Sequence, residues 1–333
     1  MDAPALRWGI LGTGWIAAAF ASALREGTRQ VVAAVGSRDP AKAAAFGGRF
    51  GIPLTGTYAD LVAADVDVVY VASPHSEHRD HALLCLDAGK PVLVEKAFTR
   101  NAAEAAEVVG VAQERGLFCM EAMWSRFLPH YDIVRQLVGD GSLGDIQTVT
   151  ADHGQLLWPG GPQRLADPAL AGGALLDLGI YPISFAHMVL GELGDPVAVG
   201  TLTEQGVDAQ VSILALTSSG AQAVLTTTMA ARTATVATVS GTRARVEIDG
   251  VFYGPGTGRL VAPDETMLGQ WVPVDHDHAG LSYEAAEVAR RITAGETSSP
   301  LMSPAESVRI MRFMDRVREQ IGVRYPGEPV PGA

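Results

Sequence analysis

The sequence contains 333 residues, a length that favours two domains over one continuous hydrophobic core. Hydrophobic residues make up 47% of the chain and charged residues 19%, the balance of a water-soluble folded protein. The formal net charge of −12 excludes nucleic acid and anionic membrane surfaces as partners, because both bind to concentrated basic surfaces.

Two cysteines, Cys85 and Cys119, fall in apolar segments, which predicts buried thiols in a reducing compartment. No apolar run approaches the roughly 18–20 residues of a membrane helix. The start of the chain, residues 7–23, superficially imitates a secretory signal peptide. Its glycines instead have the spacing of a nucleotide-binding turn, so we expect a cytoplasmic protein.

The first structural signal is a short apolar run, residues 8–11, that leads into a glycine-rich turn and a helix. The turn has the pattern G-x-G-x-x-A, which is typical of a dinucleotide-binding unit in this strand–turn–helix context. Gly12 permits the tight turn, Gly14 allows a pyrophosphate to approach the backbone, and Ala17 keeps the helix near the strand. An ordinary strand-to-helix turn is the alternative. The expected dinucleotide contacts here are Gly9, Gly12, Thr13, Gly14, Trp15 and Ile16.

Strands and helices alternate along residues 7–121, a rhythm that predicts a doubly wound parallel sheet. After the first strand and helix, strands are expected at residues 30–36, 66–72, 91–94 and 117–121. Helices are expected at residues 40–50, 78–88 and 102–115. Asp39 supplies an N-cap ahead of Pro40, and Asn101 with Glu104 has the pattern of a capping box.

The rhythm changes after residue 124. A helix at residues 129–138 and strands near 145–152 precede a Gly-Gly pair and a helix that extends to about residue 190. Four or five strands are expected within residues 196–275, including 207–216 and 243–248, and helices at 283–294 and 304–320.

These patterns predict an α/β protein of two domains. Residues 1–123 form an N-terminal Rossmann domain with a doubly wound parallel sheet. Residues 124–333 form a C-terminal α+β domain with a large, mostly antiparallel open sheet, and the C-terminal helices are free to pack back on the first domain.

The end of the second strand indicates which dinucleotide is bound. A carboxylate at this position hydrogen-bonds the ribose of NAD, whereas an arginine accommodates the 2′-phosphate of NADP. Here the strand ends in Gly36-Ser37-Arg38, with Lys42 four residues further on, and Asp39 is interpreted as a helix cap. Arg38 grips a phosphate bidentately and Ser37 donates a hydroxyl, so NADP(H) is expected in preference to NAD(H). An exposed surface arginine is the alternative.

Polar residues also follow the next two long strands, at the sheet edge where open α/β sheets bind ligands. Expected cofactor contacts are therefore Ser73, Pro74, His75, His78, Glu95 and Lys96. The three histidines His75, His78 and His81 invite a metal interpretation. No set of cysteines or carboxylates with a recognisable metal-ligand spacing accompanies these histidines, so no metal is expected.

Further motifs complete the pattern: Lys90-Pro-Val-Leu-Val-Glu-Lys96, Glu121-Ala-Met-Trp-Ser-Arg-Phe-Leu-Pro129, Gly172-Gly-Ala-Leu-Leu-Asp-Leu-Gly-Ile-Tyr181-Pro182 and Tyr283-Glu-Ala-Ala-Glu-Val. With the N-terminal turn, they resemble the Gfo/Idh/MocA oxidoreductase family over nearly the whole chain. The resemblance is to the family's branch of dimeric dihydrodiol dehydrogenases and NADP-dependent D-xylose dehydrogenases. It implies a homo-oligomer, a dimer or a larger assembly, formed through the open sheet.

The resemblance also implies roles for individual residues. Lys96, Asp177 and Tyr181 correspond to the family's catalytic residues, and the same three residues contact the substrate. Trp124 matches an aromatic wall of the substrate pocket, and His153 stands where these enzymes tend to carry phenylalanine. Ala97 replaces the proline of the family's Glu-Lys-Pro motif, which leaves the local backbone open.

The chemistry of such a pair is consistent without the family. Oxidation of an alcohol needs a base for its proton while hydride leaves for the nicotinamide. A lysine ammonium about 4 Å from a tyrosine favours phenolate by up to ~4 kcal/mol at an effective dielectric of about 20, which would bring the tyrosine pKa near the working pH. Asp177 and Tyr181 share a face if their segment is helical, and Pro182 complicates that expectation because proline is tolerated only in a helix's first turn or at a kink. A core tyrosine with a satisfied hydroxyl is the alternative.

The expected function is therefore NADP(H)-dependent oxidation or reduction of a small polyol, aldose or related carbonyl compound. A trans-dihydrodiol, a cyclitol or a dicarbonyl are alternative substrates. A regulator that senses nucleotide without turnover is the alternative from another class, although a sensor has no need of an acid–base pair. Arg126 and Arg164 are possible substrate or cofactor contacts, and residues 276–278 are interpreted as a solvated linker or as the edge of the pocket.

Overall fold

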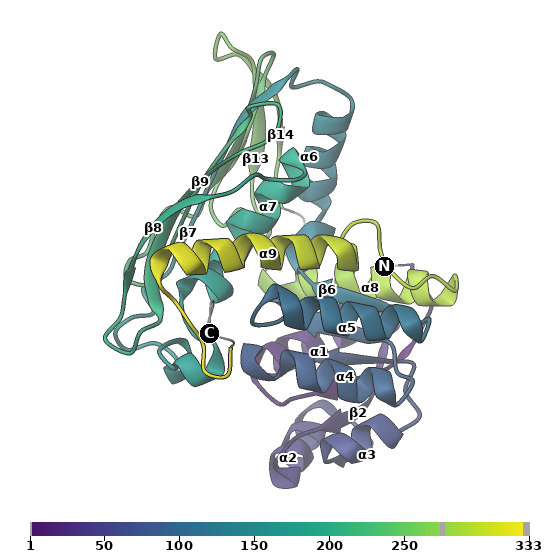
Figure 1. Cartoon of the computed structure of the whole chain (residues 1–333). Coiled ribbons are helices and arrows are strands. Elements are labelled where there is room, and N and C mark those ends of the chain that lie inside the picture. The colour runs from purple at the N-terminus through teal and green to yellow at the C-terminus, as the bar shows by residue number, and fades with distance from the viewer. Residues whose placement is uncertain (1, 274–276, 329–333) are drawn as a thin grey trace. The chain divides into compact units, whose positions relative to one another are not determined.

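The computed structural model describes residues 2–273 and 277–328, and the chain divides into two compact units (Figure 1). Unit 1 consists of Met1–Phe127 and Asp275–Val308, and unit 2 consists of Leu128–Val274 and Arg309–Ala333. The chain therefore returns to unit 1 near its C-terminal end before it completes unit 2.

Unit 1 contains a six-stranded sheet of parallel strands in the order β3-β2-β1-β4-β5-β6. The order reverses between β1 and β4, which places a topological switch point at their carboxyl ends. The predicted doubly wound parallel sheet is confirmed. Its elements are β1 Arg7–Leu11, α1 Trp15–Gly27, β2 Val31–Gly36, α2 Pro40–Phe50, β3 Leu54–Gly56, α3 Tyr58–Ala63, β4 Val68–Val71, α4 His78–Asp87, β5 Val92–Glu95, α5 Ala102–Glu114, β6 Cys119–Ala122 and α8 Leu281–Thr293.

Strand β3 and helix α3 were not expected from the sequence. They have only three and six residues, too few to show a hydrophobic period. The helix begins at a capping box, in which the Thr57 hydroxyl accepts the Asp60 N–H and the Asp60 carboxylate accepts the Thr57 N–H.

Two helix caps in unit 1 were predicted from the sequence, at Asp39 and at Asn101. The Asp39 carboxylate accepts the Ala41 N–H at 2.9 Å, with Pro40 in the first turn of α2, as expected. Asn101 caps α5 by accepting the Glu104 N–H at 3.0 Å. The Glu104 carboxylate, the other member of the expected capping box, pairs with Arg100.

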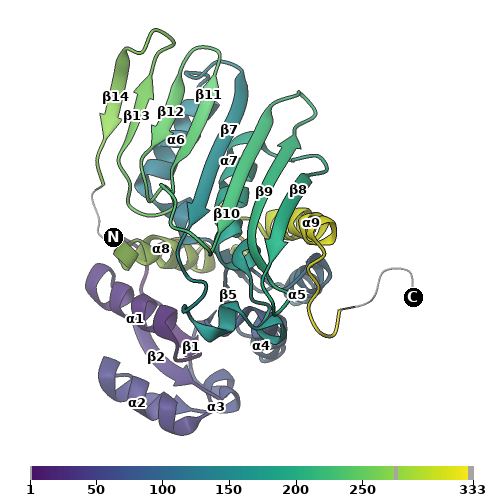
Figure 2. The same ribbon diagram turned by 90° about the vertical axis from the view of Figure 1, so that its left-hand side faces the viewer.

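Unit 2 contains an eight-stranded sheet in the order β14-β13-β12-β11-β7-β10-β9-β8 (Figure 2). All neighbours are antiparallel except β7 and β10, so the sheet is mostly antiparallel as predicted, with more strands than expected. Its elements are α6 Pro129–Gly139, β7 Ile146–Gly154, α7 Ile180–Leu190, β8 Val197–Leu202, β9 Asp208–Leu216, β10 Gln222–Thr228, β11 Ala237–Gly241, β12 Arg245–Ile248, β13 Gly258–Val261 and β14 Met267–Trp271, and the division between units falls within α9 Pro304–Ile321.

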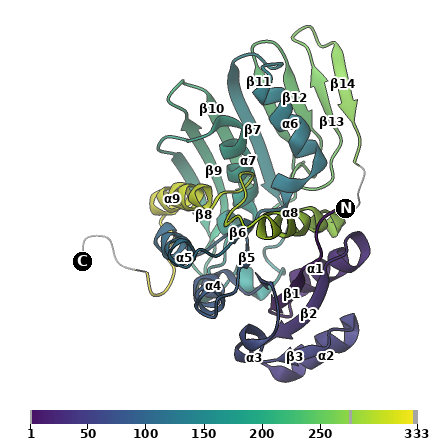
Figure 3. The same cartoon turned by 90° about the vertical axis from the view of Figure 1, so that its right-hand side faces the viewer.

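The two faces of the unit 2 sheet differ. Helices α6 and α7 lie against one face, whereas no helix of the described part of unit 2 covers the other (Figures 2 and 3). In β9 the residues alternate strictly between buried and exposed from Gln210 onward, which is the pattern of a sheet covered on one side.

Two further expectations compare with the structure. Cys85 and Cys119 are buried free thiols, and burial raises the pKa of each to about 12.

One described stretch, Pro168–Leu190, is long and apolar enough by length and composition to cross a membrane, contrary to our expectation, and 89% of its most apolar window is buried inside the structure. A buried core helix meets the same criteria, so this is weak evidence for a membrane span.

Candidate active site

The glycine-rich turn after β1 has the geometry that a dinucleotide requires. Gly12 has a φ of +114°, and a Cβ there would lie 2.5 Å from the Ala72 carbonyl oxygen, so only glycine fits. Gly14 caps α1, and a Cβ on Gly14 would meet no atom within 4 Å. Thr13 and Ile16 are half-buried beside it, and Gly9 is buried within β1. The start of α1 therefore has room for a ligand beside Gly14, and a helix N-terminus, whose first N–H groups have no intrahelical partner, fits a pyrophosphate.

The turn after β2 lies at the same edge of the sheet. The Gly12 N–H donates to the Gly36 carbonyl at 2.9 Å, which ties the two turns together. Ser37 is buried, whereas Arg38 and Lys42 are exposed. Burial raises the pKa of the Tyr58 phenol, and the adjacent Arg38 guanidinium acts in the opposite direction. Tyr58 is a neighbour of Arg38 that the sequence did not single out.

Two histidines hold the segment that carries Lys96. His75 Nε2 lies 3.2 Å from the Lys96 carbonyl oxygen, and His78 Nδ1 lies 2.9 Å from the Ala97 carbonyl oxygen. His78 Nε2 also lies 2.8 Å from the Ser73 carbonyl oxygen. Burial lowers the pKa of His78 to about 4, so the ring is neutral and donates to one of its two carbonyls at a time. These contacts link the turn after β4, which contains Ser73 and Pro74, to the turn after β5.

Lys96 itself is half-buried at the carboxyl end of β5. The preceding carboxylate of Glu95 accepts a short hydrogen bond from the Tyr70 hydroxyl and another, at 3.1 Å, from the Lys96 N–H. The Lys96–Ala97 peptide bond is cis. Among the described residues no group of three histidine, cysteine or acidic side chains could hold a metal ion.

His278 packs between two tryptophans of unit 1. Its ring meets Trp15 edge-on at 5.2 Å and stacks on Trp124 at 5.8 Å. Trp15 is 62% exposed and begins α1, whereas Trp124 is buried. The solvated-linker interpretation is therefore wrong for His278, while His276 lies outside the described residues. The aromatic contact joins the expected cofactor turn to the expected pocket wall.

Arg126 has a structural partner in unit 1. It is 2% exposed, pairs with Glu306 at 2.7 Å and donates to the Leu301 carbonyl oxygen at 3.3 Å. The interpretation of Arg126 as a substrate contact is therefore replaced by a role in anchoring the C-terminal segment of unit 1.

Glu121 in β6 makes the stability of unit 1 depend on pH. Burial raises its carboxyl pKa to about 7 from 4.5, although the Phe98 N–H and the Arg126 charge oppose the rise. A raised pKa means that its stabilising contribution is complete below the unfolded-state value of 4.5 and is lost as the pH rises through about 7.

Glu121→Gln is therefore expected to gain roughly 2–3 kcal/mol in the free energy of unfolding, relative to the unmodified chain, when the pH rises from about 5 to about 8. Urea denaturation at both pH values measures this difference. Glu114→Gln, at an exposed position, controls for the loss of one charge. A difference between the Glu121 variant and the unmodified chain that does not change with pH would contradict the assignment.

In unit 2, Asp177 and Tyr181 lie on two consecutive turns of different geometry. Residues Leu175–Gly179 form a π-helical turn, and α7 starts at Ile180, so Pro182 falls within the first α-helical turn. This resolves the conflict that Pro182 raised, because a first-turn proline is tolerated and π-turns are frequent at functional sites. Both side chains are 7% exposed. Arg164 pairs with Asp177 at 2.9 Å and so fixes its carboxylate.

An aromatic cluster surrounds Tyr181. Tyr253 stacks on its ring at 4.2 Å and 25°, and His153 meets it edge-on at 5.4 Å. His153 is 1% exposed, and both its ring nitrogens have partners: the Leu178 carbonyl oxygen and the Gln155 amide. Neither Tyr253 nor Gln155 was predicted, since each lies distant in sequence from the motif that contains Tyr181.

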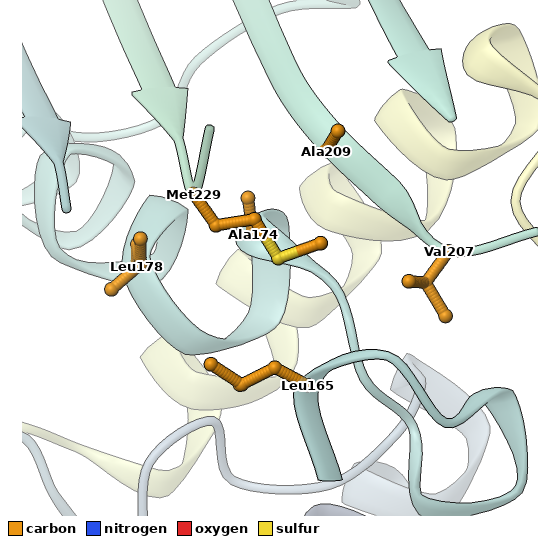
Figure 4. Close-up of a cluster of buried hydrophobic side chains, with 6 residues drawn as sticks. All are labelled: Leu165, Ala174, Leu178, Val207, Ala209 and Met229. Carbon is orange, nitrogen blue, oxygen red and sulfur yellow. The ribbon is translucent and has the colours of Figure 1, made fainter. Parts of the chain in front are cut away.

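A buried apolar cluster packs around the π-helical turn and includes a residue of the turn itself. Figure 4 shows its members: Leu165, Ala174, Leu178, Val207, Ala209 and Met229. Two polar anchors hold the entry to the turn: the Asp208 carboxylate accepts the Leu175 N–H at 2.6 Å, and the Tyr325 hydroxyl donates to the Gly172 carbonyl at 2.8 Å. The glycine pair allows this approach, because a Cβ on Gly173 would lie 2.1 Å from an Asp208 oxygen.

Comparison with known protein families assigns both parts of the chain. Residues 6–123 match the model of the oxidoreductase family with an NAD-binding Rossmann fold, and residues 131–247 match the GFO/IDH/MocA C-terminal domain. The chain belongs to the Gfo/Idh/MocA oxidoreductase family. The predicted family, fold class and enzyme class are thereby confirmed.

Known relatives of this family member align with almost the whole length of the chain. It is 37% identical over 332 residues to trans-1,2-dihydrobenzene-1,2-diol dehydrogenase of Xenopus laevis, covering 97% of this chain and 100% of the relative. It is 36% identical to the human enzyme of the same name, covering 97% and 98%.

Solved structures of two enzymes are also similar to this chain. A 3-ketoreductase from Actinomadura kijaniata in complex with NADP and TDP-benzene gives a TM-score of 0.83 at 29% identity, covering 96% of this chain and 98% of that one. An aldose-aldose oxidoreductase from Caulobacter crescentus complexed with glycerol gives 0.86 at 26% identity, covering 95% and 97%. The NADP preference and the individual residue roles stay predictions.

Proposed function

We propose that this oxidoreductase transfers hydride between NADP(H) and a small six-membered ring that carries neighbouring oxygens, in the oxidised form a ketone or lactone and in the reduced form a hydroxyl. This class contains pyranose aldoses, which are among the substrates expected from the sequence with small polyols and related carbonyl compounds, and trans-dihydrodiols, which were an alternative there. The observation that carries the proposal is that a lysine and a tyrosine, which the family resemblance marks as catalytic, are each held in place by neighbouring residues of this chain. Lys96 is held after β5 by two histidine contacts to its segment, and Tyr181 is held by stacking in the first turn of α7.

Three side chains have separate proposed roles in the reaction. When bound, the dinucleotide accepts or supplies the hydride. We assign the proton to the Tyr181 phenol oxygen and polarisation of the substrate hydroxyl to the Lys96 ammonium. Asp177, fixed by Arg164, accepts a hydrogen bond from a second substrate hydroxyl, which is why neighbouring oxygens are expected.

A substrate screen tests this proposal. D-xylose, a trans-dihydrodiol and the acyclic polyol xylitol are each supplied with NADP and with NAD, and reduced nucleotide is measured. We expect turnover of a cyclic compound and little turnover of xylitol. Turnover of xylitol alone would contradict the ring requirement, and tight NADP binding without turnover of any of the three would favour a nucleotide-sensing regulator.

The preference for NADP depends in this proposal on Arg38 and Lys42. Their exposed side chains follow the second strand, where the 2′-phosphate of the ribose is expected. NADP should bind at least about tenfold more tightly than NAD, and Arg38→Ala should lose most of that preference, because tenfold corresponds to ~1.4 kcal/mol, within reach of one charge-assisted contact. Fluorescence titration measures both affinities, and Arg49→Ala, near the C-terminal end of α2, is the matched control. Equal affinities in the unmodified chain would contradict the assignment.

The open face of the unit 2 sheet is proposed to bind a second copy of the chain. Exposed apolar side chains gather on its outer strands β8 to β10: Val197, Val199, Leu202, Leu214, Leu216 and Val224. Such a contiguous apolar surface is typical of an interface. We expect a dimer or larger assembly at micromolar concentration by sedimentation, weakened by Val199→Glu. Leu156→Glu, at an equally exposed loop position, is the control, and a monomeric unmodified chain would contradict the proposal.

A further inference from the structure

His153 makes a hydrogen bond to the π-helical turn that leads into α7 and Tyr181. Its partner is the carbonyl of Leu178 within that turn, which also accepts the Ile180 N–H and lies four residues before Pro182, a residue with no N–H. His153 Nδ1 lies 3.0 Å from that carbonyl oxygen and is buried with it. Because a carbonyl only accepts, the ring must carry its proton on Nδ1.

Gln155 completes the arrangement. With the proton on Nδ1, His153 Nε2 is an acceptor, and the Gln155 side-chain amide donates to it at 2.9 Å. The same amide nitrogen donates to the Tyr253 hydroxyl oxygen at 3.1 Å. Both amide hydrogens are therefore used, and the amide ties the histidine to the tyrosine.

This chain of contacts ends on the ring of Tyr181. Tyr253 covers one face of the phenol by stacking, while His153 meets it edge-on. Burial raises the pKa of Tyr253 to about 12, so Tyr253 remains a neutral phenol that supports its neighbour rather than competing for the proton. The backbone of His153 is held in turn, since the Thr227 hydroxyl donates to its carbonyl oxygen at 3.2 Å.

We propose that His153, Gln155 and Tyr253 are positioning residues that together fix the orientation of the Tyr181 phenol at the junction between the π-helical turn and α7. This inference rests on the proposed function of Tyr181. It departs from the sequence-based expectation that His153 contacts substrate, because both ring nitrogens make hydrogen bonds to other groups of the protein. Reorientation of a reacting group by about 1 Å is enough to lower the rate by 10²-fold.

His153→Phe tests the proposal because it keeps a flat ring and removes both hydrogen bonds. We expect kcat with NADP and the better of D-xylose and a trans-dihydrodiol to fall about 10–100-fold, with KM and NADP affinity nearly unchanged. His153→Asn, whose amide nitrogen replaces Nδ1, should recover part of the loss. Gln155→Met is the second variant, expected to lower kcat less because the Leu178 contact remains.

A measurement without substrate reads the orientation directly. Stacked tyrosines contribute to the near-ultraviolet circular dichroism, and we expect His153→Phe and Gln155→Met to reduce the part of that signal that Tyr181→Phe removes. The matched control is His187→Phe, a buried histidine on α7 whose ring instead contacts Phe313. It should lower the melting temperature comparably and leave kcat and the dichroism signal unchanged.

The outcomes separate the catalytic role of Tyr181 from the positioning role of its neighbours. If Tyr181→Phe retains turnover, the proposed proton-transfer role of Tyr181 fails, whatever the other variants do. If Tyr181→Phe is inactive while His153→Phe and Gln155→Met keep full kcat and the full dichroism signal, the positioning role is overturned alone. The positioning role is also overturned if His187→Phe loses kcat as much as His153→Phe does.

Discussion

Replacing Tyr181 by phenylalanine is expected to lower kcat by about 10²–10⁴-fold while NADP affinity changes little. The loss is that of a general acid–base group, and phenylalanine preserves the ring that stacks on Tyr253. Steady-state kinetics on a substrate found by the screen, together with NADP titration, measure the two effects. Tyr131→Phe, a buried tyrosine of unit 2 that packs on Phe185, is the control and should keep its turnover.

Lys96→Met should also lower kcat strongly. The double variant with Tyr181→Phe should be far from additive, because groups that act as one unit are lost together. If Tyr181→Phe retained most of its turnover, the proton would have to go to another group. Lys96 would then be the better candidate, since both ring nitrogens of His153 already have partners within unit 2.

Replacing Arg126 by methionine is expected to destabilise the protein by about 3–5 kcal/mol, a fall of roughly 5–10 °C in melting temperature. The guanidinium is 2% exposed and the Glu306 side chain 15%, so the variant leaves a carboxylate largely out of water without its partner. Solvent screening is weak at this burial, and the cost is that of an uncompensated charge. Urea denaturation and thermal melting measure the change.

Two further variants test this origin of the effect. Arg126→Met with Glu306→Met removes both charges and should recover much of the lost stability. Arg29→Met removes one partner of the exposed ion pair with Asp2, where side-chain exposures are 66% and 101%, and should cost little. An Arg126→Met protein as stable as the unmodified chain would show that the pair does not anchor the segment.

Local patterns in the sequence were sufficient to predict the parallel sheet of unit 1. The spacing of Gly12 and Gly14 between a strand and a helix predicts a tight turn, and the structure confirms it with a φ of +114° at Gly12. The Asp39 cap also followed from adjacent residues. The pair β3 and α3 was missed because such short elements depend on their neighbours for stability.

The candidate site was predicted unevenly for the same reason. Motifs contiguous in sequence predicted Lys96, Asp177 and Tyr181, whereas their supporting groups come from distant segments. Gln155 and Tyr253 are 98 positions apart, and no periodicity or spacing connects them. The partner of Arg126 lies 180 residues away, so its guanidinium could equally have been assigned to a ligand.

The sequence by itself determined the glycine turn, the parallel sheet and the family, because each depends on steric limits or side-chain chemistry within a few positions. Only the tertiary structure decided how Pro182 is accommodated, by a π-helical turn whose Leu178 carbonyl meets His153. It also decided that His278 packs between two tryptophans. The physical reason is that a buried polar group takes whichever partner the packed chain brings within hydrogen-bond distance, and that partner is set by the whole fold rather than by adjacent residues.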